Sequence, residues 1–284
     1  MGDTTSPLML RRRLRTELRA ARLRKGLSQE QVAEAMDWSL SKIIRIEGAT
    51  SGISTNDLKA LLSLYSIMDK ERAEELVALA RAARQTPWWR HYRDIAPPGL
   101  LELIDYESAA SSVSQLETMF VPGILQTEEY ACAVLQCFFE ETSAPERVAA
   151  LVDLRTRRRN LLTNEYAPKF SFIVDESIVH RPVVNPSVMS RQLRYLVTVA
   201  ELPNVTIQVV PFIAGLHPGM KGPFEVVQSD DEESVVFLEG SRGDFISDDP
   251  IEAQVYLGAF ERIEAVSLSP LDSVGLLKAR GEIT

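Results

Sequence analysis

Two short helices joined by a tight turn are predicted from residues 26–47, Gly-Leu-Ser-Gln-Glu-Gln-Val-Ala-Glu-Ala-Met-Asp-Trp-Ser-Leu-Ser-Lys-Ile-Ile-Arg-Ile-Glu. Ser28 and Gln31 have the spacing of a capping box, which indicates that the first helix begins after Ser28. Ser39 is a preferred residue type for the cap of the second helix. Helical spacing gives the first helix an inward face made of Val32, Ala33 and Met36.

The second of these helices has two different faces. Ile43 and Ile46 lie on its inward side. The opposite side would be exposed to solvent and consists of Leu40, Ser41, Ile44 and Arg45. The small side chain of Ala33 lets the two helices cross closely, and an exposed face of mixed polar and apolar side chains suits the DNA major groove, which is about 12 Å wide. The pattern therefore indicates DNA reading.

Apolar stripes on both sides of this segment predict three more helices. The helix before it is ended by Gly26 and carries Leu10, Leu14, Leu18 and Ala21. The helix after it begins near Ser54 or Thr55 and buries Leu58, Leu61, Leu62 and Tyr65. A last helix runs from about Asp69 to Arg84. Residues 1–86 are therefore predicted to form an all-α, five-helix domain.

Charge divides the chain into two modules. The 284 residues have a formal net charge of −9, which by itself argues against a nucleic-acid partner. Residues 1–87, however, contain 15 Lys and Arg against 11 Asp and Glu, whereas the remaining residues contain 16 against 29. Eight of the basic side chains lie within residues 11–25, where only Glu17 opposes them. The basic module suits the phosphates of DNA, and the acidic module does not.

Residues 11–66 resemble the Xre family of lambda-repressor-like DNA-binding domains. The resemblance rests on Gly26-Leu27-Ser28-Gln29 and on the spacing of Ala33, Ser39, Ser41, Ile43, Arg45, Ile46 and Glu47. It implies that Gln29 donates to a phosphate and that Lys42 contacts a phosphate or a base. It also implies a base-reading surface made of Leu40, Ser41 and Arg45, with Ser39 and Ile44 on the same DNA-binding face.

The same resemblance implies an ion pair between Arg22 and Glu47 inside the domain. The sequence departs from the family at two positions. Asp37 stands where the family has a turn glycine, and aspartate tolerates a left-handed backbone less easily than glycine does. Ile44 replaces a polar side chain, and it would either contact a thymine methyl group or pack against the turn.

Residues 87–284 predict a second domain that mixes helices and strands. Helices are expected at 103–117, from Thr127 to about Glu141, and from the Ser143-x-x-Glu146 capping box to Leu162. Further helices begin at Asn185-Pro186, Asp249-Pro250 and Ser269-Pro270. Strands are expected at 169–175, 204–210, 223–228 and 234–239, the last two as a hairpin. The fold class is thus α+β, with a C-terminal mixed α/β domain that contains a small sheet.

An aromatic connector joins the two modules and contains Trp88, Trp89, His91 and Tyr92. It forms the seam between the domains, or it contributes to a ligand pocket or a partner surface. Residues 88–278 resemble the C-terminal domain of actinomycete Xre-type regulators related to WhiJ. The motifs are Trp88-Trp89-x2-Tyr92, residues 121–130 (Val-Pro-Gly-Ile-Leu-Gln-Thr-Glu-Glu-Tyr), residues 201–205 (Glu-Leu-Pro-Asn-Val) and Gly222-Pro223-Phe224. This resemblance implies an antitoxin-like domain and a small partner protein encoded nearby.

An enzymatic second domain is an alternative, because Asp175, Glu176, Ser177 and His180 follow a predicted strand, where active-site residues often occur. Ser177 lacks the Gly-x-Ser-x-Gly elbow, and no second base follows His180 at a useful spacing. The sequence also lacks His-Glu-x-x-His, Cys-x-x-Cys and a phosphate-binding glycine loop. We therefore expect no catalytic residue, no metal and no cofactor.

The sequence thus predicts a transcriptional regulator that binds an operator in double-stranded DNA. One short recognition helix touches few bases, which favours a homodimer on two half-sites. The acidic domain would dimerise, or receive a signal or a small partner protein. The alternatives are a DNA-tethered enzyme and an antitoxin that acts mainly by binding a partner protein. No secretory signal and no apolar run of roughly 18 residues is present, so a cytoplasmic, nucleoid-associated location is expected, without membrane contact.

Overall fold

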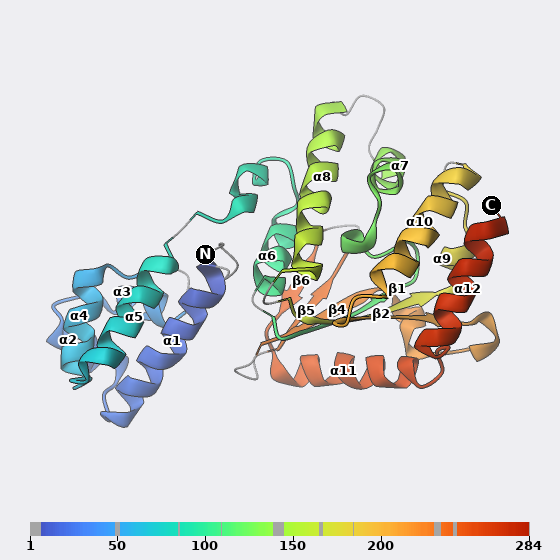
Figure 1. Cartoon of the computed structure of the whole chain (residues 1–284). Coiled ribbons are helices and arrows are strands. Elements are labelled where there is room, and N and C mark those ends of the chain that lie inside the picture. Colours follow the sequence, from blue (N-terminus) through green and yellow to red (C-terminus); the bar gives the residue numbers. More distant parts are fainter. Residues whose placement is uncertain are drawn as a thin grey trace. The chain divides into compact units, whose positions relative to one another are not determined.

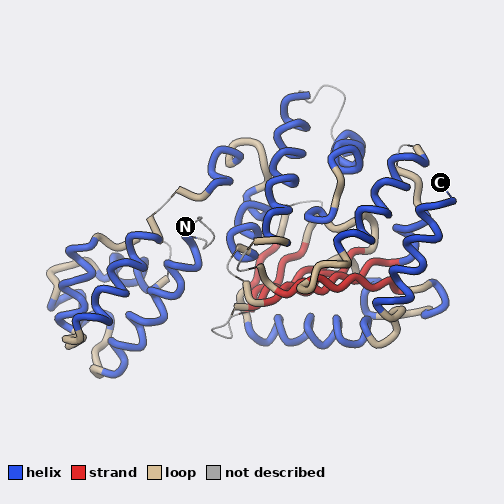
Figure 2. The backbone as a smooth tube through the Cα atoms, viewed as in Figure 1, coloured by secondary structure: helices blue, strands red, loops and turns tan. Residues whose placement is uncertain are grey.

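The structure, a computed structural model, divides the chain into two compact units, Met1–Arg90 and His91–Thr284. It describes residues 7–48, 52–84, 86–108, 110–138, 145–164, 167–183, 185–229, 234–240 and 243–283. The first unit is helical, whereas the second contains a sheet covered by helices (Figures 1 and 2). Within these ranges, no helix combines the length and the hydropathy that a membrane-spanning segment needs.

The first unit is the predicted bundle of five helices, α1 (Pro7–Arg24), α2 (Gln29–Ala35), α3 (Leu40–Glu47), α4 (Thr55–Leu64) and α5 (Lys70–Ala82). The predicted capping box is present, because Ser28 Oγ accepts from the Gln31 N–H and Gln31 Oε1 accepts from the Ser28 N–H. The next three helices are capped by Ser39, Ser54 and Asp69. These side chains satisfy backbone N–H groups that have no partner within their helices.

One apolar core holds these helices together. Its most deeply buried side chains include Leu18, Val32, Ile43, Leu58, Leu61 and Leu76. Ala33 is buried between α2 and its neighbours, and its small side chain allows the close approach of α2 and α3. Helix α3 contributes only Ile43 and Ile46 to the core, so its opposite face stays in solvent.

The turn between α2 and α3 has a left-handed backbone at Asp37, with a φ of 52°. The Trp38 N–H donates to the carbonyl of Ala33 at 2.9 Å and closes the end of α2. Glycine adopts such a backbone freely, and aspartate is one of the few other residues that visit it routinely. Asp37 therefore adopts a left-handed backbone at the position where the family resemblance leads one to expect a glycine.

The second unit is built on a mixed sheet of six described strands, β1 (Ser112–Glu117), β2 (Lys169–Asp175), β3 (Val205–Val210), β4 (Phe224–Gln228), β5 (Ser234–Leu238) and β6 (Phe245–Ser247). Their order is β3-β2-β1-β4-β5-β6. Strands β1, β2 and β3 are parallel, whereas β4, β5 and β6 each run antiparallel to the preceding neighbour in this order. The α+β fold class and the small mixed sheet are thus confirmed.

Helices cover both faces of this sheet (Figure 1). Helix α11 (Pro250–Glu264) lies along one face, where its Ala253, Phe260 and Ile263 pack against Leu116, Ile173, Val226 and Val236. Over the opposite face lie α6 (Pro98–Glu107), α8 (Pro145–Arg158) and α10 (Pro186–Val199). Helices α7 (Glu128–Phe138), α9 (Glu176–His180) and α12 (Pro270–Ile283) complete the unit, and α12 packs on α10 and β3.

The helix predicted at 103–117 is wrong in its second half. Helix α6 ends at Glu107, and β1 begins at Ser112 in the middle of the sheet. Gln115 and Glu117 of β1 point to the sheet face away from α11. Because these two residues are polar, β1 lacks the alternation of apolar residues by which a strand is normally recognised in a sequence. Strand β6 was not predicted either. Ser143 lies outside the described residues, and α8 begins at Pro145.

Candidate functional site

The exposed face of α3 carries four side chains on two successive turns. Leu40 and Ile44 expose 37% and 49% of their surface, and Ser41 and Arg45 are exposed as well. Residues four apart lie above one another on a helix, so these side chains form two adjacent rows. The Arg45 Nε–H donates to the carbonyl of Ser41 at 3.3 Å. We call Leu40, Ser41, Ile44 and Arg45 the α3 strip.

Ser39 and Lys42 flank the α3 strip and are engaged within the domain. Ser39 Oγ accepts from the Lys42 N–H at 3.3 Å as the helix cap. Lys42 Nζ lies 3.1 Å from Asp57 Oδ2 and 3.7 Å from the centre of the Trp38 ring. The ring face and the carboxylate both attract the ammonium group, and they hold it at the edge of the strip. Sequence analysis did not predict either partner.

A buried ion pair ties α3 to α1. Arg22 Nε lies 2.7 Å from Glu47 Oε1, and Arg22 Nη2 donates to Glu47 Oε2 at 3.0 Å. The two side chains are only 9% and 6% exposed, and the hydrogen bond with Glu47 raises the pKa of Arg22 above its ordinary value. Arg22 Nη1 also donates to the carbonyl of Leu27 at 2.7 Å. The orientation of α3 therefore depends on this pair.

Gln29 joins the same network. Its Nε2 donates to Glu47 Oε2 at 2.7 Å, which links the start of α2 to the end of α3. A side-chain amide has two N–H donors, so this contact uses one of them inside the domain. Gln29 therefore supports the end of the helix that carries the α3 strip.

The aromatic connector forms a short 3-10 helix, η1 (Trp88–Tyr92), whose four aromatic side chains do not share one exposed surface. Trp89 and Tyr92 are buried, whereas Trp88 is half-buried and His91 is exposed. The Trp88 and Trp89 rings meet edge to face at 5.5 Å, and the Tyr92 hydroxyl donates to Asp153 of α8. Trp89 and Tyr92 therefore contribute to packing, Trp88 and His91 are the more exposed members of the set, and the ligand or partner surface expected here stays a prediction.

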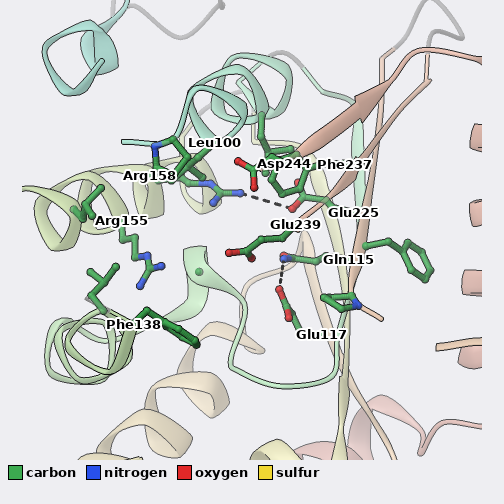
Figure 3. A pocket seen from close by; sticks show the side chains of 17 residues that line it. Leu100, Gln115, Glu117, Phe138, Arg155, Arg158, Glu225, Phe237, Glu239 and Asp244 are labelled. Atoms are coloured by element: carbon green, nitrogen blue, oxygen red, sulfur yellow. Dashed lines mark hydrogen bonds and ion pairs between the residues drawn. The ribbon is translucent and has the colours of Figure 1, made fainter. Parts of the chain in front are cut away.

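The second unit contains a cavity of about 220 Å³ on the sheet face opposite α11 (Figure 3). The sheet side of the cavity carries its polar groups, Gln115, Glu117, Glu225, Glu239 and Asp244, together with Pro223, Phe224 and Phe237. The wall made by α6, α7 and α8 is apolar and includes Leu100, Leu103, Leu135, Phe138 and Leu151. Two arginines of α8, Arg155 and Arg158, also line it. We call this space the acidic cavity.

Arg158 lies at the centre of a buried charge cluster. Its Nε and Nη2 each donate to an oxygen of Glu107 at 2.6 Å, and Nη2 lies 3.7 Å from Glu225 Oε2. All three side chains are at least nine-tenths buried. Both Glu225 oxygens lack a hydrogen-bond donor among the described residues. Burial and the charge of Glu107 raise the pKa of Glu225 well above its ordinary value.

Further polar groups of the acidic cavity lie beside this cluster. Gln115 Nε2 donates to Glu117 Oε1 at 3.1 Å, whereas no described donor reaches Gln115 Oε1. Removal from water and the charge of Glu239 raise the pKa of Glu117 to about 8. Arg155 Nη1 donates to Gln126 Oε1 at 2.9 Å, and burial lowers the pKa of Arg155 to about 10. Arg155 is therefore still a cation at neutral pH.

Sequence analysis did not identify the acidic cavity, although the sequence contains a signal for it. Arg155 and Arg158 stand at helical spacing from Val148 and Leu151, where the apolar stripe of α8 should continue. Glu225 stands between the apolar residues Phe224 and Val226 of β4, on the sheet face that Val227 shares. Charged residues at inward positions of predicted elements mark a polar interior site.

The residues considered for catalysis have contacts within the fold. Asp175 Oδ1 accepts from the Ser177 N–H at 2.9 Å and caps α9. Glu176 Oε1 lies 3.0 Å from His180 Nε2, and Glu176 Oε2 accepts from the Phe212 N–H at 2.7 Å. In the part of the chain that the structure describes, no group of three His, Cys, Asp or Glu residues could hold a metal ion.

Two families match the sequence, one in each unit. Residues 13–76 match a helix-turn-helix domain, and residues 100–279 match a domain of unknown function, DUF5753. Neither a curated protein nor a solved structure matches the sequence significantly. The first match identifies the bundle that presents the α3 strip as a helix-turn-helix domain, the type of domain that binds DNA in regulators.

Proposed function

Because the chain belongs to the DUF5753 family and carries a helix-turn-helix domain ahead of it, we propose that it is a sequence-specific transcriptional regulator of the Xre type. Residues 1–86 bind an operator in double-stranded DNA. Residues 87–284 act as an effector domain that pairs two copies of the chain and receives a signal. The α3 strip is the observation that carries this proposal.

The α3 strip supports base reading, because its four side chains are exposed on a helix whose other face is fixed in the core. Arg45 donates to a guanine edge, and Ser41 contacts a neighbouring base. Leu40 and Ile44 make apolar contacts, and the 49% exposure of Ile44 supports contact with a thymine methyl group. Gln29, Ser39 and Lys42 position the helix on the phosphates.

We predict that Arg45→Ala weakens binding to the cognate operator by about 1–3 kcal/mol and changes binding to unrelated DNA much less. The reason is that a base contact carries sequence information, whereas a phosphate contact does not. The operator is first obtained by selection from random duplexes with the full chain. Mobility shifts on the selected and a scrambled duplex then give both affinities.

Arg81→Ala is the matched control for this measurement. Arg81 is an exposed arginine of α5, so its replacement removes the same charge without changing the α3 strip. We expect it to affect both duplexes equally and weakly. The proposed role of Arg45 would be contradicted if Arg45→Ala and Arg81→Ala weakened operator binding equally, or if selection produced no preferred sequence.

We also propose that the protein is a homodimer through its second unit. A single recognition helix of eight residues reads only a few bases, and regulators gain affinity by pairing half-sites about 34 Å apart. The segment after β3 exposes large apolar side chains, Phe212, Ile213, Leu216 and Met220, which supports a protein contact there.

We predict that sedimentation equilibrium of the full chain gives a dimer, and that Ile213→Asp with Leu216→Asp shifts it toward the monomer. These two side chains are 94% and 92% exposed, so their replacement does not affect the core. Glu201→Gln, which changes an exposed residue of the same unit, is the control and should not dissociate the dimer. A monomer at all concentrations, both free and on operator DNA, would exclude this assembly.

A further inference from the structure

We propose that the acidic cavity binds a small organic ammonium ion with an apolar body. This inference names a ligand class for the signal-receiving role proposed for the second unit. It rests on that proposed function only for what the ligand does in the cell, and not for the binding itself. The cavity belongs entirely to the second unit, because its lining residues lie between Pro97 and Asp244. Its binding chemistry is therefore independent of DNA recognition.

The charges that line the acidic cavity favour a cation. Arg158 is matched by Glu107, with which it shares two hydrogen bonds of 2.6 Å. Among the described lining residues, four carboxyl groups then remain against the single guanidinium of Arg155, namely Glu117, Glu225, Glu239 and Asp244. Glu225 is buried, Glu117 and Asp244 are half-buried, and Glu239 is exposed. A surplus of one charge type around a partly buried site favours the addition of an opposite charge. A bound cation supplies that charge.

The hydrogen-bonding groups of the acidic cavity favour a donor. Four buried side-chain atoms of the described residues have no hydrogen-bond partner, and three of them belong to lining residues. These are both oxygens of Glu225 and Oε1 of Gln115, and all three are acceptors when Glu225 is ionised. Gln115 and Glu225 come from neighbouring strands, in register with each other, on the same face of the sheet (Figure 3). An ammonium group brings three N–H donors to them.

The apolar wall opposite the carboxyl groups determines the body that the ammonium ligand carries. Leu100, Leu103, Leu135, Phe138 and Leu151 contribute apolar surface from three helices. A cavity of roughly 150 Å³ holds a benzene molecule with its six carbon atoms, so about 220 Å³ holds about nine non-hydrogen atoms. The ligand class is thus a monoamine with an aryl or branched alkyl body, rather than a metal ion or a large cofactor.

The protonation of the carboxyl groups agrees with this assignment. Removal from water raises the pKa of Glu117 to about 8, and it raises the pKa of Glu225 and Asp244 as well. Before a ligand binds, the side chain of Glu117, with a pKa of about 8, is therefore mostly protonated at pH 7. A bound ammonium ion would lower the pKa values of these carboxyl groups by its charge, and ionisation would strengthen the contact.

The experiment is isothermal titration calorimetry of the full chain with 2-phenylethylamine, tyramine and isopentylamine. We expect at least one amine to bind one-to-one, and its neutral counterpart, 2-phenylethanol for the first, to bind at least tenfold more weakly. Glu117→Gln and Glu239→Gln should each weaken amine binding by roughly tenfold to a hundredfold, because each removes a charged partner. Glu239 is exposed, so its replacement leaves the fold intact.

Glu261→Gln is the matched control, because Glu261 is an exposed glutamate of α11 on the other face of the sheet. It should leave amine binding unchanged. The proposal is overturned if none of the three amines binds, if 3-phenylpropanoate or Mg²⁺ binds more tightly than the amines, or if Glu261→Gln weakens binding as much as Glu117→Gln does. No DNA is present in this assay, so its failure is distinguishable from a failure of operator binding.

Discussion

Arg158→Met is expected to lower the free energy of unfolding of the second unit by about 3–5 kcal/mol. The guanidinium of Arg158 is the partner of both Glu107 oxygens at 2.6 Å and lies 3.7 Å from Glu225. All three side chains are fully enclosed, so removal of the cation leaves two carboxyl groups buried without a counter-charge. Methionine fills a similar volume, so the loss of stability measures the removal of the charge rather than a change in packing.

Differential scanning calorimetry of the full chain can measure this loss. Trp38 packs against the core of the first unit, whereas Trp88 and Trp89 lie in the connector helix η1. In a Trp88→Phe, Trp89→Phe background, tryptophan fluorescence therefore identifies the transition that belongs to the first unit. The control is Arg157→Met, because Arg157 pairs with Asp153 at the surface and is 51% exposed. A surface pair is worth at most about 1 kcal/mol. Equal effects of the two substitutions would show that Arg158 does not stabilise the unit through its charge.

Arg22→Met is expected to destabilise the first unit by a comparable amount, about 3–5 kcal/mol. Among the described residues, it would leave the buried Glu47 with the Gln29 amide as its hydrogen-bond partner, and it would remove the hydrogen bond from Arg22 Nη1 to the carbonyl of Leu27. Because the pair connects α1 with the end of α3, the loss should also loosen the α3 strip. DNA affinity should therefore fall for every duplex, in contrast to the selective effect of Arg45→Ala.

Urea unfolding in the Trp88→Phe, Trp89→Phe background, followed by the fluorescence of Trp38, measures the stability of the first unit. Arg24→Met, which replaces an exposed arginine two residues along α1, is the control and should change stability by less than about 1 kcal/mol. The double variant Arg22→Met with Glu47→Leu should recover part of the loss, because it removes the uncompensated carboxylate. A double variant that is less stable than either single variant would contradict the account of the buried pair.

The first unit could be predicted from the sequence because local signals and tertiary packing agree there. Ser28 with Gln31, and Ser39, are caps whose partners lie within the same turn, so their hydrogen bonds follow from spacing alone. The buried and exposed faces of α3 follow from helical periodicity for the same reason. Asp37 shows the limit of this approach, since its left-handed backbone was suggested only by the family resemblance.

The second unit was predicted less well because its site breaks the patterns that reveal structure. Gln115 and Glu117 replace apolar residues on the inner face of β1, and the strand was taken as the end of a helix. The acidic cavity also combines residues that are more than a hundred positions apart, such as Gln115 and Glu225. Such a grouping depends on the strand order, which no local pattern specifies.

The side-chain partners of Lys42 and Gln29 could not be predicted from the sequence either. Lys42 was assigned to a phosphate or a base, whereas its ammonium group lies between the Trp38 ring and Asp57. Gln29 was assigned to a phosphate, and its amide also binds Glu47. Both are long polar side chains whose direction depends on neighbours from other helices, and spacing along one helix does not specify those neighbours.

The salt dependence of duplex binding by the full chain tests the central claim most directly. The whole chain has a net charge of −9, which by itself does not favour association with DNA. Affinity for DNA must therefore come from the basic first unit. If the basic first unit docks the α3 strip in the major groove, log K for the selected operator should fall linearly with log salt, by about 0.9 for each phosphate neutralised. Fluorescence anisotropy from low to physiological salt measures this slope. The predicted result is a linear fall of log K whose slope corresponds to several phosphates. Binding to the operator should also be tighter than binding to a scrambled duplex at every salt concentration. No binding to any duplex at low salt, or binding without a preference for the operator, would contradict it.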